Sequence, residues 1–301
     1  MSVNNHGESS SNSDSLDIQA KLDKLIQENN SLKETNESLQ GQVEQIRKEQ
    51  IVYLQNVSHQ LVAPLNAMKW HIENLTAGRL RSIERIQKVL RSIYSQATIA
   101  VHLAKNFALM SNLEADQTLA AQREPLEPVE LQRLMVNLAD DFQPLGWDKN
   151  VHISVIDHPL EEAPPVLAIK NLISQVFSNI IENAVKYSKT MTEITIYGHY
   201  NPDNDTVCVC ISNTGIPLPS NEEIERIFSR GYRSKDAQNI YPAGTGFGMY
   251  IAEKIIDIHE GSITAYTDKE GHSVFQVTLS VKRLKGKAVQ RESKDSAHHR
   301  R

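Results

Sequence analysis

The chain has 301 residues, carries a formal net charge of −5 and contains two cysteines. This length suggests about two domains, and the mildly acidic balance gives no indication of nucleic-acid binding. No apolar run reaches the ~18–20 residues needed to cross a membrane, and the polar N-terminus lacks the apolar core of a signal peptide. We therefore expect a cytoplasmic protein without a membrane span.

The N-terminal quarter of the chain predicts a coiled coil. Residues 1–14 are rich in Ser and Asn and are predicted to be disordered. Residues 15–56 carry a heptad repeat, whose seam consists of Ile18, Leu22, Leu25, Asn29, Leu32, Asn36, Leu39, Val43, Ile46, Gln50 and Tyr53. A Leu-rich seam with two Asn favours a parallel dimer, because a buried Asn pairs best with its own copy. A long solvated single helix explains the charges but leaves the seam unexplained.

Residues 57–115 predict a helical hairpin with a histidine on its surface. Apolar residues recur at three- and four-residue steps and form one helix face: Leu54, Val57, Leu61, Leu65, Met68, Ile72 and Leu75. His59 lies off that face, and Pro64 removes a backbone donor, which should bend the helix. The pattern stops near Gly78, and a second heptad begins at Ile83. Two such hairpins in a homodimer form a four-helix bundle, with His59 on its outside.

The remaining chain predicts a linker, an α/β domain and a tail. Residues 116–128 are polar with two prolines and form the expected linker. Within residues 129–281 we predict helices near 131–142 and 168–187 and from 247, and strands at 151–156, 193–200, 206–212, 262–267 and 273–281. This mixture indicates an α/β sandwich with helices on one side of a sheet, so the fold class is α+β. The basic tail, residues 282–301, is predicted to be disordered.

Both cysteines fall on one predicted strand. Cys208 and Cys210 alternate, so their side chains point to one face of the sheet. We expect reduced thiols in a protein core. A single CxC pair is a weak indication of a metal site, because zinc needs further ligands and the chain has no second pair.

The helix expected at 168–187 carries a polar stripe. Asn179, Asn183 and Lys186 are spaced i, i+4 and i+7, so they share one helix face. Two amides and an amine can hold a phosphate and a hydrated Mg²⁺, which takes oxygen ligands and keeps its waters. A polar helix face is more often merely solvated, so the stripe needs support from elsewhere.

That support comes from two glycine-bearing loops. Residues 213–219, NTGIPLP, follow a strand, and residues 244–248, GTGFG, open a helix. Glycines let the backbone approach a phosphate, and the free amides at a helix start favour an anion. The polar segment 234–243 between the loops has no periodicity and is predicted to be a mobile lid. One such loop is a poor signal, whereas two in this order after the polar helix are more specific.

These motifs together resemble those of the bacterial sensor histidine kinases. VSHQLVAPL resembles the phospho-acceptor box, NIIENAVKYS the N-box, and SNTGIPLP and GTGFGMYIAEKIIDIHEG the two glycine boxes, with IFSRGYR before the lid. The resemblance covers residues 50–281 in family order and spacing. It implies a dimerisation and histidine-phosphotransfer bundle followed by a Bergerat-type (GHKL) ATP-binding domain.

The resemblance also implies roles for individual residues. His59 would accept the γ-phosphoryl group, and Asn183 would coordinate Mg²⁺, with Asn179 beside it. Lys186 would contact phosphate, and Tyr187 would lie near the adenine. The implied ATP-binding set also includes Asn213, Gly215, Gly244, Thr245, Gly246, Phe247 and Gly248.

Four positions depart from the family pattern. Asn213 replaces an aspartate that accepts the adenine amino hydrogen, and an Asn carbonyl can still accept that bond. Pro217 replaces the second glycine of its box. Gln60 replaces the acid that follows the histidine and takes its proton, so we count Gln60 as a catalytic position with an altered residue. Ala63 replaces a Thr or Asn that positions water for dephosphorylation of a partner.

Three functions remain open from the sequence. The first is a histidine kinase that autophosphorylates with ATP and Mg²⁺ and passes the phosphoryl group to the aspartate of a response-regulator receiver domain. The second is an ATPase of the same superfamily, which Asn179 disfavours because it stands where those enzymes carry a catalytic glutamate. The third is a pseudokinase that acts as a dimeric signalling scaffold. No sensor domain is recognisable before the coiled coil, so an upstream sensor protein is an expected further partner.

Overall fold

The computed structural model describes residues 8–77, 82–114, 125–220, 223–242 and 244–281. The chain divides into two units, residues 1–55 and 56–301. Several predicted segments lie outside the described residues: positions 1–7, the glycine at the predicted hairpin turn, most of the linker and the basic tail.

The first unit is formed by the N-terminal part of helix α1 (Glu8–Thr76). The helix already begins at Glu8, so the prediction of disorder at residues 8–14 is wrong. Ser, Asn and Asp have modest helix propensity but do not break a helix, and the first proline is Pro64. The described apolar side chains of the predicted seam are exposed: Leu25, Leu32, Leu39, Val43 and Ile46. Such a row needs a covering surface, so the coiled coil stays a prediction that this exposure supports.

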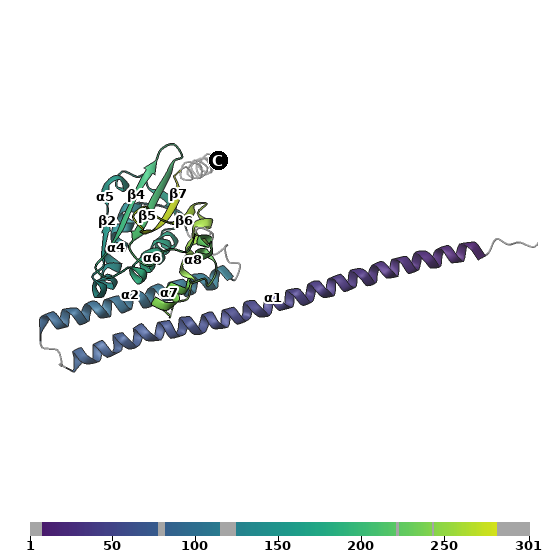
Figure 1. Ribbon diagram of the computed structural model, residues 1–301, viewed down its shortest axis with the longest axis horizontal. Coiled ribbons are helices and arrows are strands. Elements are labelled where there is room, and N and C mark those ends of the chain that lie inside the picture. The colour runs from purple at the N-terminus through teal and green to yellow at the C-terminus, as the bar shows by residue number, and fades with distance from the viewer. Residues whose placement is uncertain (1–7, 78–81, 115–124, 221–222, 243, 282–301) are drawn as a thin grey trace, which may run out of the picture. The chain divides into compact units, whose positions relative to one another are not determined.

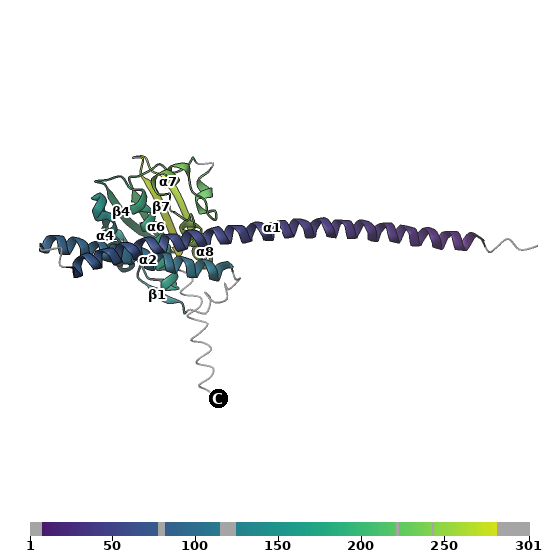
Figure 2. The same cartoon turned by 90° about the horizontal axis from the view of Figure 1, so that it is seen from below.

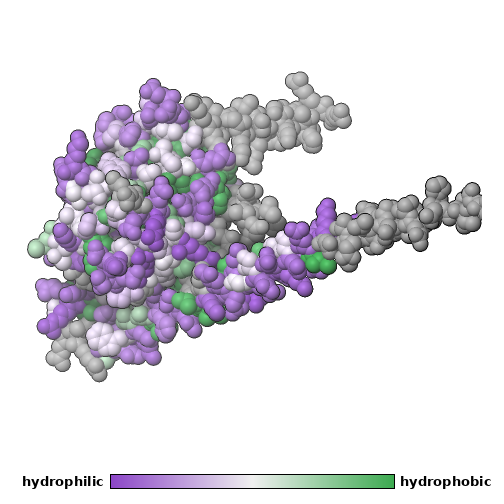
Figure 3. Space-filling view, turned by 45° about the vertical axis from the view of Figure 1, so that its right-hand side comes forward, coloured by the Kyte–Doolittle hydropathy of each residue, from purple (hydrophilic) through white to green (hydrophobic). Residues whose placement is uncertain are grey.

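The second unit begins with a helical hairpin. Helix α1 ends at Thr76, where its end was predicted, and helix α2 (Ile83–Glu114) extends beyond the predicted heptad. Figures 1 and 2 show α2 alongside the C-terminal part of α1. Large apolar residues are exposed on both helices, including Leu65, Ile72, Leu90 and Val101, and Figure 3 shows such residues among hydrophilic ones on the surface.

The hairpin is followed by a mixed five-stranded sheet with the order β2-β4-β5-β7-β6. Its strands are β2 (His152–Val155), β4 (Glu193–Asn201), β5 (Thr206–Asn213), β6 (Ser262–Thr267) and β7 (Ser273–Ser280). Strand β2 pairs with β4 in parallel, and the other neighbours are antiparallel. A two-stranded sheet of β1 (Glu127–Val129) and β3 (Val166–Ala168) was not predicted, because three residues are too few to show an alternation. The last residues of the predicted linker therefore belong to a strand.

Three helices cover one face of this sheet: α4 (Leu131–Gly146), α6 (Lys170–Tyr187) and α8 (Gly248–Ile258) (Figure 1). Their apolar sides meet alternate strand residues, and Ile194, Ile196, Phe177 and Ile180 are fully buried there. Burial of such side chains is the main stabilising contribution, about 1.5–3 kcal/mol each. The predicted α+β layout, with helices on one side of a sheet, is confirmed.

Short elements complete the domain: η1 (Trp147–Lys149), α5 (Asp157–Leu160), η2 (Ile224–Phe228) and α7 (Lys235–Ile240). Helix α7 falls within segment 234–243, which shows no periodicity in the sequence and was predicted to be a mobile lid. Ser234 caps this helix by accepting a hydrogen bond from the Ala237 amide. A single capped turn is too short for a periodic pattern, which explains why the sequence did not reveal it.

Candidate functional site

The polar stripe of α6 surrounds a buried carboxylate that the sequence had not singled out. Glu182 is almost fully buried, and its two oxygens contact two cationic or titratable groups. One oxygen lies 2.8 Å from Lys186 Nζ on the same helix. The other lies 2.7 Å from His102 Nδ1 on α2. Glu182 therefore links the predicted phosphotransfer hairpin to the α6 stripe.

Burial and the neighbouring charges have opposing effects on the pKa values of Glu182 and Lys186. Burial alone would raise the pKa of Glu182, but the attraction of Lys186 and His102 outweighs it and holds that pKa far below its usual value. Burial would likewise lower the pKa of Lys186, and the neighbouring Glu182 carboxylate raises it. Both groups are therefore charged at neutral pH and form an ion pair at the pocket.

A second set of contacts joins α2 to α6 beside this pair. Asn106 on α2 donates a hydrogen bond to Asn179 Oδ1 over 2.8 Å, and Gln175 donates to Asn106 Oδ1 over 2.9 Å. The bond from Asn106 occupies the carbonyl oxygen of Asn179. Its amide nitrogen is buried and has no hydrogen-bond partner within the described residues. An unpartnered buried donor is costly and indicates a missing acceptor.

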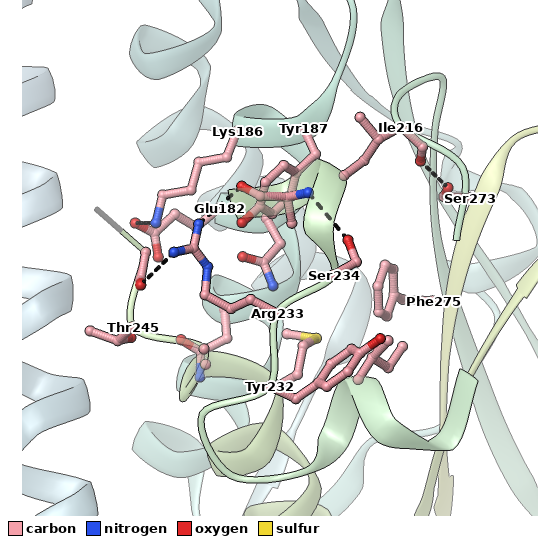
Figure 4. A pocket seen from close by; sticks show the side chains of 18 of the residues that line it. Glu182, Lys186, Tyr187, Ile216, Tyr232, Arg233, Ser234, Thr245, Ser273 and Phe275 are labelled. Carbon is pink, nitrogen blue, oxygen red and sulfur yellow. Dashed lines mark hydrogen bonds and ion pairs between the residues drawn. The ribbon is translucent and has the colours of Figure 1, made fainter. Parts of the chain in front are cut away.

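One pocket gathers most of the predicted nucleotide-binding residues (Figure 4). Nine of the eleven line it: Asn179, Asn183, Lys186, Tyr187, Asn213, Gly244, Thr245, Gly246 and Gly248. The other two support its walls. Gly215 bridges to Ser188 just after α6, where an added Cβ would lie 2.4 Å from the Tyr187 carbonyl oxygen. Phe247 is buried and forms the N-cap of α8.

The predicted acceptor, His59, directly precedes a residue that lines this pocket. His59 is exposed on α1 and is not among the lining residues, whereas Gln60 is. The Gln60 amide nitrogen is buried and has no hydrogen-bond partner within the described part of the chain. Gln60 and Asn179 therefore bring two unsatisfied amide donors to one pocket, from α1 and α6.

The opposite wall of the pocket is apolar and is fixed by loop hydrogen bonds. Ile216, Tyr232 and Phe275 line it (Figure 4). The Ile216 amide donates to the Tyr187 carbonyl, and Ser273 Oγ donates to the Ile216 carbonyl, so the loop after β5 is held against α6 and β7. Asn213 donates its amide to Ser188 Oγ over 3.3 Å, which leaves its carbonyl oxygen as the acceptor of that side chain.

Arg233 organises the predicted lid segment. Its guanidinium donates to the carbonyls of Ala237, Tyr241, Pro242 and Gly244. These bonds hold α7 and the glycine loop beside the pocket. The backbone conformation of the glycine loop requires glycine at position 246. Gly246 has φ +73°, and an added Cβ there would lie 2.7 Å from Gly231 backbone atoms.

The donor set fits a phosphorylated ligand with an apolar end. Lys186 supplies positive charge, Gln60 and Asn179 supply unsatisfied donors, and the glycine loop presents backbone at the start of α8. The described residues contain no cluster of three or more His, Cys, Asp or Glu that could hold a metal. A magnesium ion in this pocket would therefore depend on the Asn183 carbonyl, the ligand's phosphates and water, a combination that Mg²⁺ accepts.

Sequence reasoning missed several residues of the site. Glu182 lies three residues after Asn179, so the sequence predicts that both residues lie on neighbouring positions of one helix. The burial of Glu182 depends on its contact with α2, which the local sequence does not indicate. His102 and Asn106 were read only as part of a heptad helix. Arg233 is the last residue of the IFSRGYR motif, but its four carbonyl partners could not be inferred from the spacing of residues.

Comparison with known proteins agrees with this geometry. Residues 168–283 match the family described as histidine kinase-, DNA gyrase B- and HSP90-like ATPase. The histidine protein kinase SaeS of Staphylococcus epidermidis is 26% identical over 272 residues, covering 85% of this chain and 74% of the relative. The adaptive-response sensory kinase SasA of Crocosphaera subtropica is 29% identical over 286 residues, covering 94% and 72%. The catalytic domain of histidine kinase ThkA aligns at 26% identity with a TM-score of 0.44, covering 52% of this chain and 97% of that domain.

The C-terminal domain is thus an ATP-binding domain of this ATPase family, in an α+β fold with a mixed sheet. The resemblance to the bacterial sensor histidine kinases is confirmed, and as an enzyme the chain is a protein-histidine kinase. The pseudokinase alternative is not favoured, because the matched relatives are kinases. Within the described ranges, no helix has the length and hydropathy to span a membrane.

The buried carboxylate generates a prediction about stability. A carboxylate with a depressed pKa stabilises the folded state above its unfolded pKa of about 4.3, and this contribution is lost as pH falls through the folded pKa. Glu182→Gln should therefore lower the free energy of unfolding by about 3 kcal/mol at pH 7, because Lys186 loses its buried partner. The difference between the two proteins should shrink below about pH 4.

Urea unfolding at pH 7 and at successively lower pH measures this difference. Glu162→Gln is a matched control, because the carboxylate of Glu162 is exposed and lies 3.3 Å from the exposed His158 imidazole. A Glu182→Gln protein as stable as the wild type at pH 7 would contradict the account.

Proposed function

We propose that this protein binds ATP in the pocket beside α6 and transfers the γ-phosphoryl group to His59. The phosphoryl group then passes to an aspartate of a response-regulator receiver domain. The observation that carries this proposal is the pocket itself, in which unsatisfied amides of Gln60 and Asn179 meet Lys186. One of these amides belongs to the residue directly after His59.

The two walls of the pocket suit the two ends of ATP. The apolar wall with Ile216 and Phe275 would cover the adenine, and the Asn213 carbonyl would accept its amino hydrogen. At the other end Lys186 would neutralise phosphate charge, and the amides of Gln60 and Asn179 would donate to phosphate oxygens. Such positioning and neutralisation are the main protein contributions to phosphoryl transfer.

Asn183 would be the protein ligand of a magnesium ion, whose contribution is to neutralise charge on the phosphates. The contacts of Glu182 keep this region ordered, since they fix Lys186 from within α6 and join α6 to α2. Arg233 would keep the lid closed over the bound nucleotide through its carbonyl contacts.

The proton of His59 needs a route during transfer, because its nitrogen must lose a proton once it bonds phosphorus. Gln60 cannot accept that proton. The proton can instead leave to water, so attack by the neutral imidazole remains feasible. The expected consequence is a functional but slow kinase.

A homodimer is the assembly that best accounts for the helices. The exposed Leu and Ile residues of α1 and α2 form rows that a second copy would cover. The receiver domain of a response regulator would then reach His59 on the exposed side of α1. The sensor kinases among the relatives support this reading.

The first prediction concerns the acceptor. His59→Gln should abolish acid-labile, base-stable labelling by γ-labelled ATP with Mg²⁺ and should leave nucleotide binding unchanged, because His59 does not line the pocket. Asn183→Asp should lower nucleotide binding by placing a charge beside the phosphates. His71→Gln on the same helix serves as the control and should keep its label. A labelled His59→Gln protein would mean that another residue is the acceptor.

The second prediction concerns the missing acid. Gln60→Glu should raise the initial autophosphorylation rate about 10-fold, or about 1.4 kcal/mol in barrier, because a carboxylate can take the proton. Ser58→Glu adds the same charge at an exposed neighbour that does not line the pocket and should leave the rate unchanged. Rates are compared at saturating ATP. An unchanged or lower rate for Gln60→Glu would show that proton transfer to residue 60 does not limit the reaction.

The third prediction concerns assembly. Light scattering of the purified chain at micromolar concentration should give the mass of a dimer. Replacing exposed Leu32 and Leu39 with Asp should raise the monomer fraction, because charges do not pack in a heptad seam. The same substitution at exposed Lys33 and Glu37 is the control. A monomeric wild-type chain would contradict the proposed bundle.

A further inference from the structure

A series of three side-chain amides connects α2 to the pocket. Gln175 on α6 donates a hydrogen bond from Nε2 to Asn106 Oδ1 on α2, over 2.9 Å. Asn106 in turn donates from Nδ2 to Asn179 Oδ1 on α6, over 2.8 Å. Both lengths are usual for an N–H group and a carbonyl oxygen. We call this series, which runs from Gln175 through Asn106 to Asn179, the amide relay.

The amide relay is largely shielded from water. Gln175 and Asn179 expose only 4% and 1% of their surface, and Asn106 is partly buried. A shielded amide that loses its partner cannot replace the lost hydrogen bond with one to water, so the loss is costly. Each amide is therefore expected to keep the orientation that satisfies its neighbour, which gives the relay a fixed direction.

This direction decides which end of the Asn179 amide remains available. An Asn side chain carries an acceptor oxygen and a donor NH₂ group. Because Asn106 holds the oxygen, the NH₂ group is left over, and it has no hydrogen-bond partner among the described residues. In a reversed relay Asn179 would donate to Asn106 and leave its oxygen over instead. Phosphate oxygens accept hydrogen bonds, so the observed direction suits a phosphate in the pocket and the reversed one opposes it.

The start of α8 favours the same orientation. Gly248 is the first residue of α8 and lies against Asn179, since an added Cβ there would be 3.6 Å from Asn179 Oδ1. The N-terminus of a helix carries a partial positive charge, which attracts a carbonyl oxygen and repels an NH₂ group. Helix α8 and Asn106 therefore both hold the oxygen of Asn179.

The first two members of the relay can act on a ligand through Asn179. Gln175 does not line the pocket. Asn106 lines it, but both ends of its amide already bond to Gln175 and Asn179. Asn179 is thus the member of the relay whose NH₂ group has no other partner in the described part of the chain.

We propose that Asn106 and Gln175 are positioning residues for ATP, whose relay holds the NH₂ group of Asn179 toward the phosphates. This inference rests on the proposed function, because it takes the ligand of Asn179 to be a phosphate of ATP. Asn106 belongs to the hairpin, whereas Asn179 belongs to the ATP-binding domain. Affinity for the phosphates therefore depends on the contact between α2 and α6, and affinity for the nucleoside does not.

Asn106→Asp tests the direction of the relay. A carboxylate accepts hydrogen bonds from both Gln175 and Asn179 but donates none, so Asn179 has to turn its oxygen toward the phosphates. Affinity for ATP with Mg²⁺ should fall about 10-fold, the effect of losing one hydrogen bond to a charged group, whereas affinity for adenosine should stay unchanged. Isothermal titration calorimetry on the full-length chain measures both affinities.

Gln175→Met tests the relay from outside the pocket. Methionine has a similar shape but cannot donate to Asn106, which is then free to turn. Affinity for ATP should fall by less than in Asn106→Asp, again with adenosine binding unchanged. Lys105→Gln is the control for charge: it alters the net charge by the same amount as Asn106→Asp, at an exposed neighbour that does not line the pocket, and should change neither affinity.

Urea unfolding shows whether each variant is folded. Equal losses of ATP and adenosine affinity, or unchanged ATP affinity in both variants, would overturn the relay and leave the proposed function standing. A wild-type chain that does not bind ATP would overturn both. Should neither variant fold, nuclear magnetic resonance of the wild type decides: ATP should shift the side-chain NH₂ signals of Asn179 and adenosine should not, and signals that ATP leaves in place would overturn the relay.

Discussion

The buried charge of Glu182 is the constraint around which the site is arranged. A carboxylate removed from water destabilises the fold unless cations or hydrogen-bond donors contact it. The side chains that make these contacts are therefore held in place. Here it fixes Lys186 within α6 and His102 on α2. One side chain thereby orders the cationic end of the pocket and joins the ATP-binding domain to the helix hairpin.

The two walls of the pocket differ in polarity and in the elements that form them. The sheet and the loop after β5 form an apolar, preformed wall, whereas the polar wall is assembled from α6, α2 and α1. The unsatisfied amides of Gln60 and Asn179 lie on the assembled wall. A ligand that supplies phosphate oxygens would satisfy both donors, so nucleotide binding and the approach of the histidine-bearing helix are expected to be coupled.

Periodicity explains how much of this could be predicted from the sequence. Alternation along β4 and β7 and the stripes of α6 and α8 identified these elements, because one face of each is more deeply buried than the other. Strand β5 is buried on both faces. Strands β1 and β3 and helix α7 are too short to show a period. The pattern of β5 placed both cysteines on one face but could not tell which face the helices cover. The partners of Glu182 and Arg233 come from distant segments, so local sequence carries no signal for them.

The central claim is that ATP bound in this pocket phosphorylates His59. The most direct measurement is to incubate the wild-type chain with ATP and Mg²⁺, digest it at alkaline pH and locate the phosphoryl group by tandem mass spectrometry. The account predicts a phosphohistidine at position 59 that disappears after brief acid treatment. A phosphoryl group confined to another residue, or none despite demonstrated ATP binding, would contradict it.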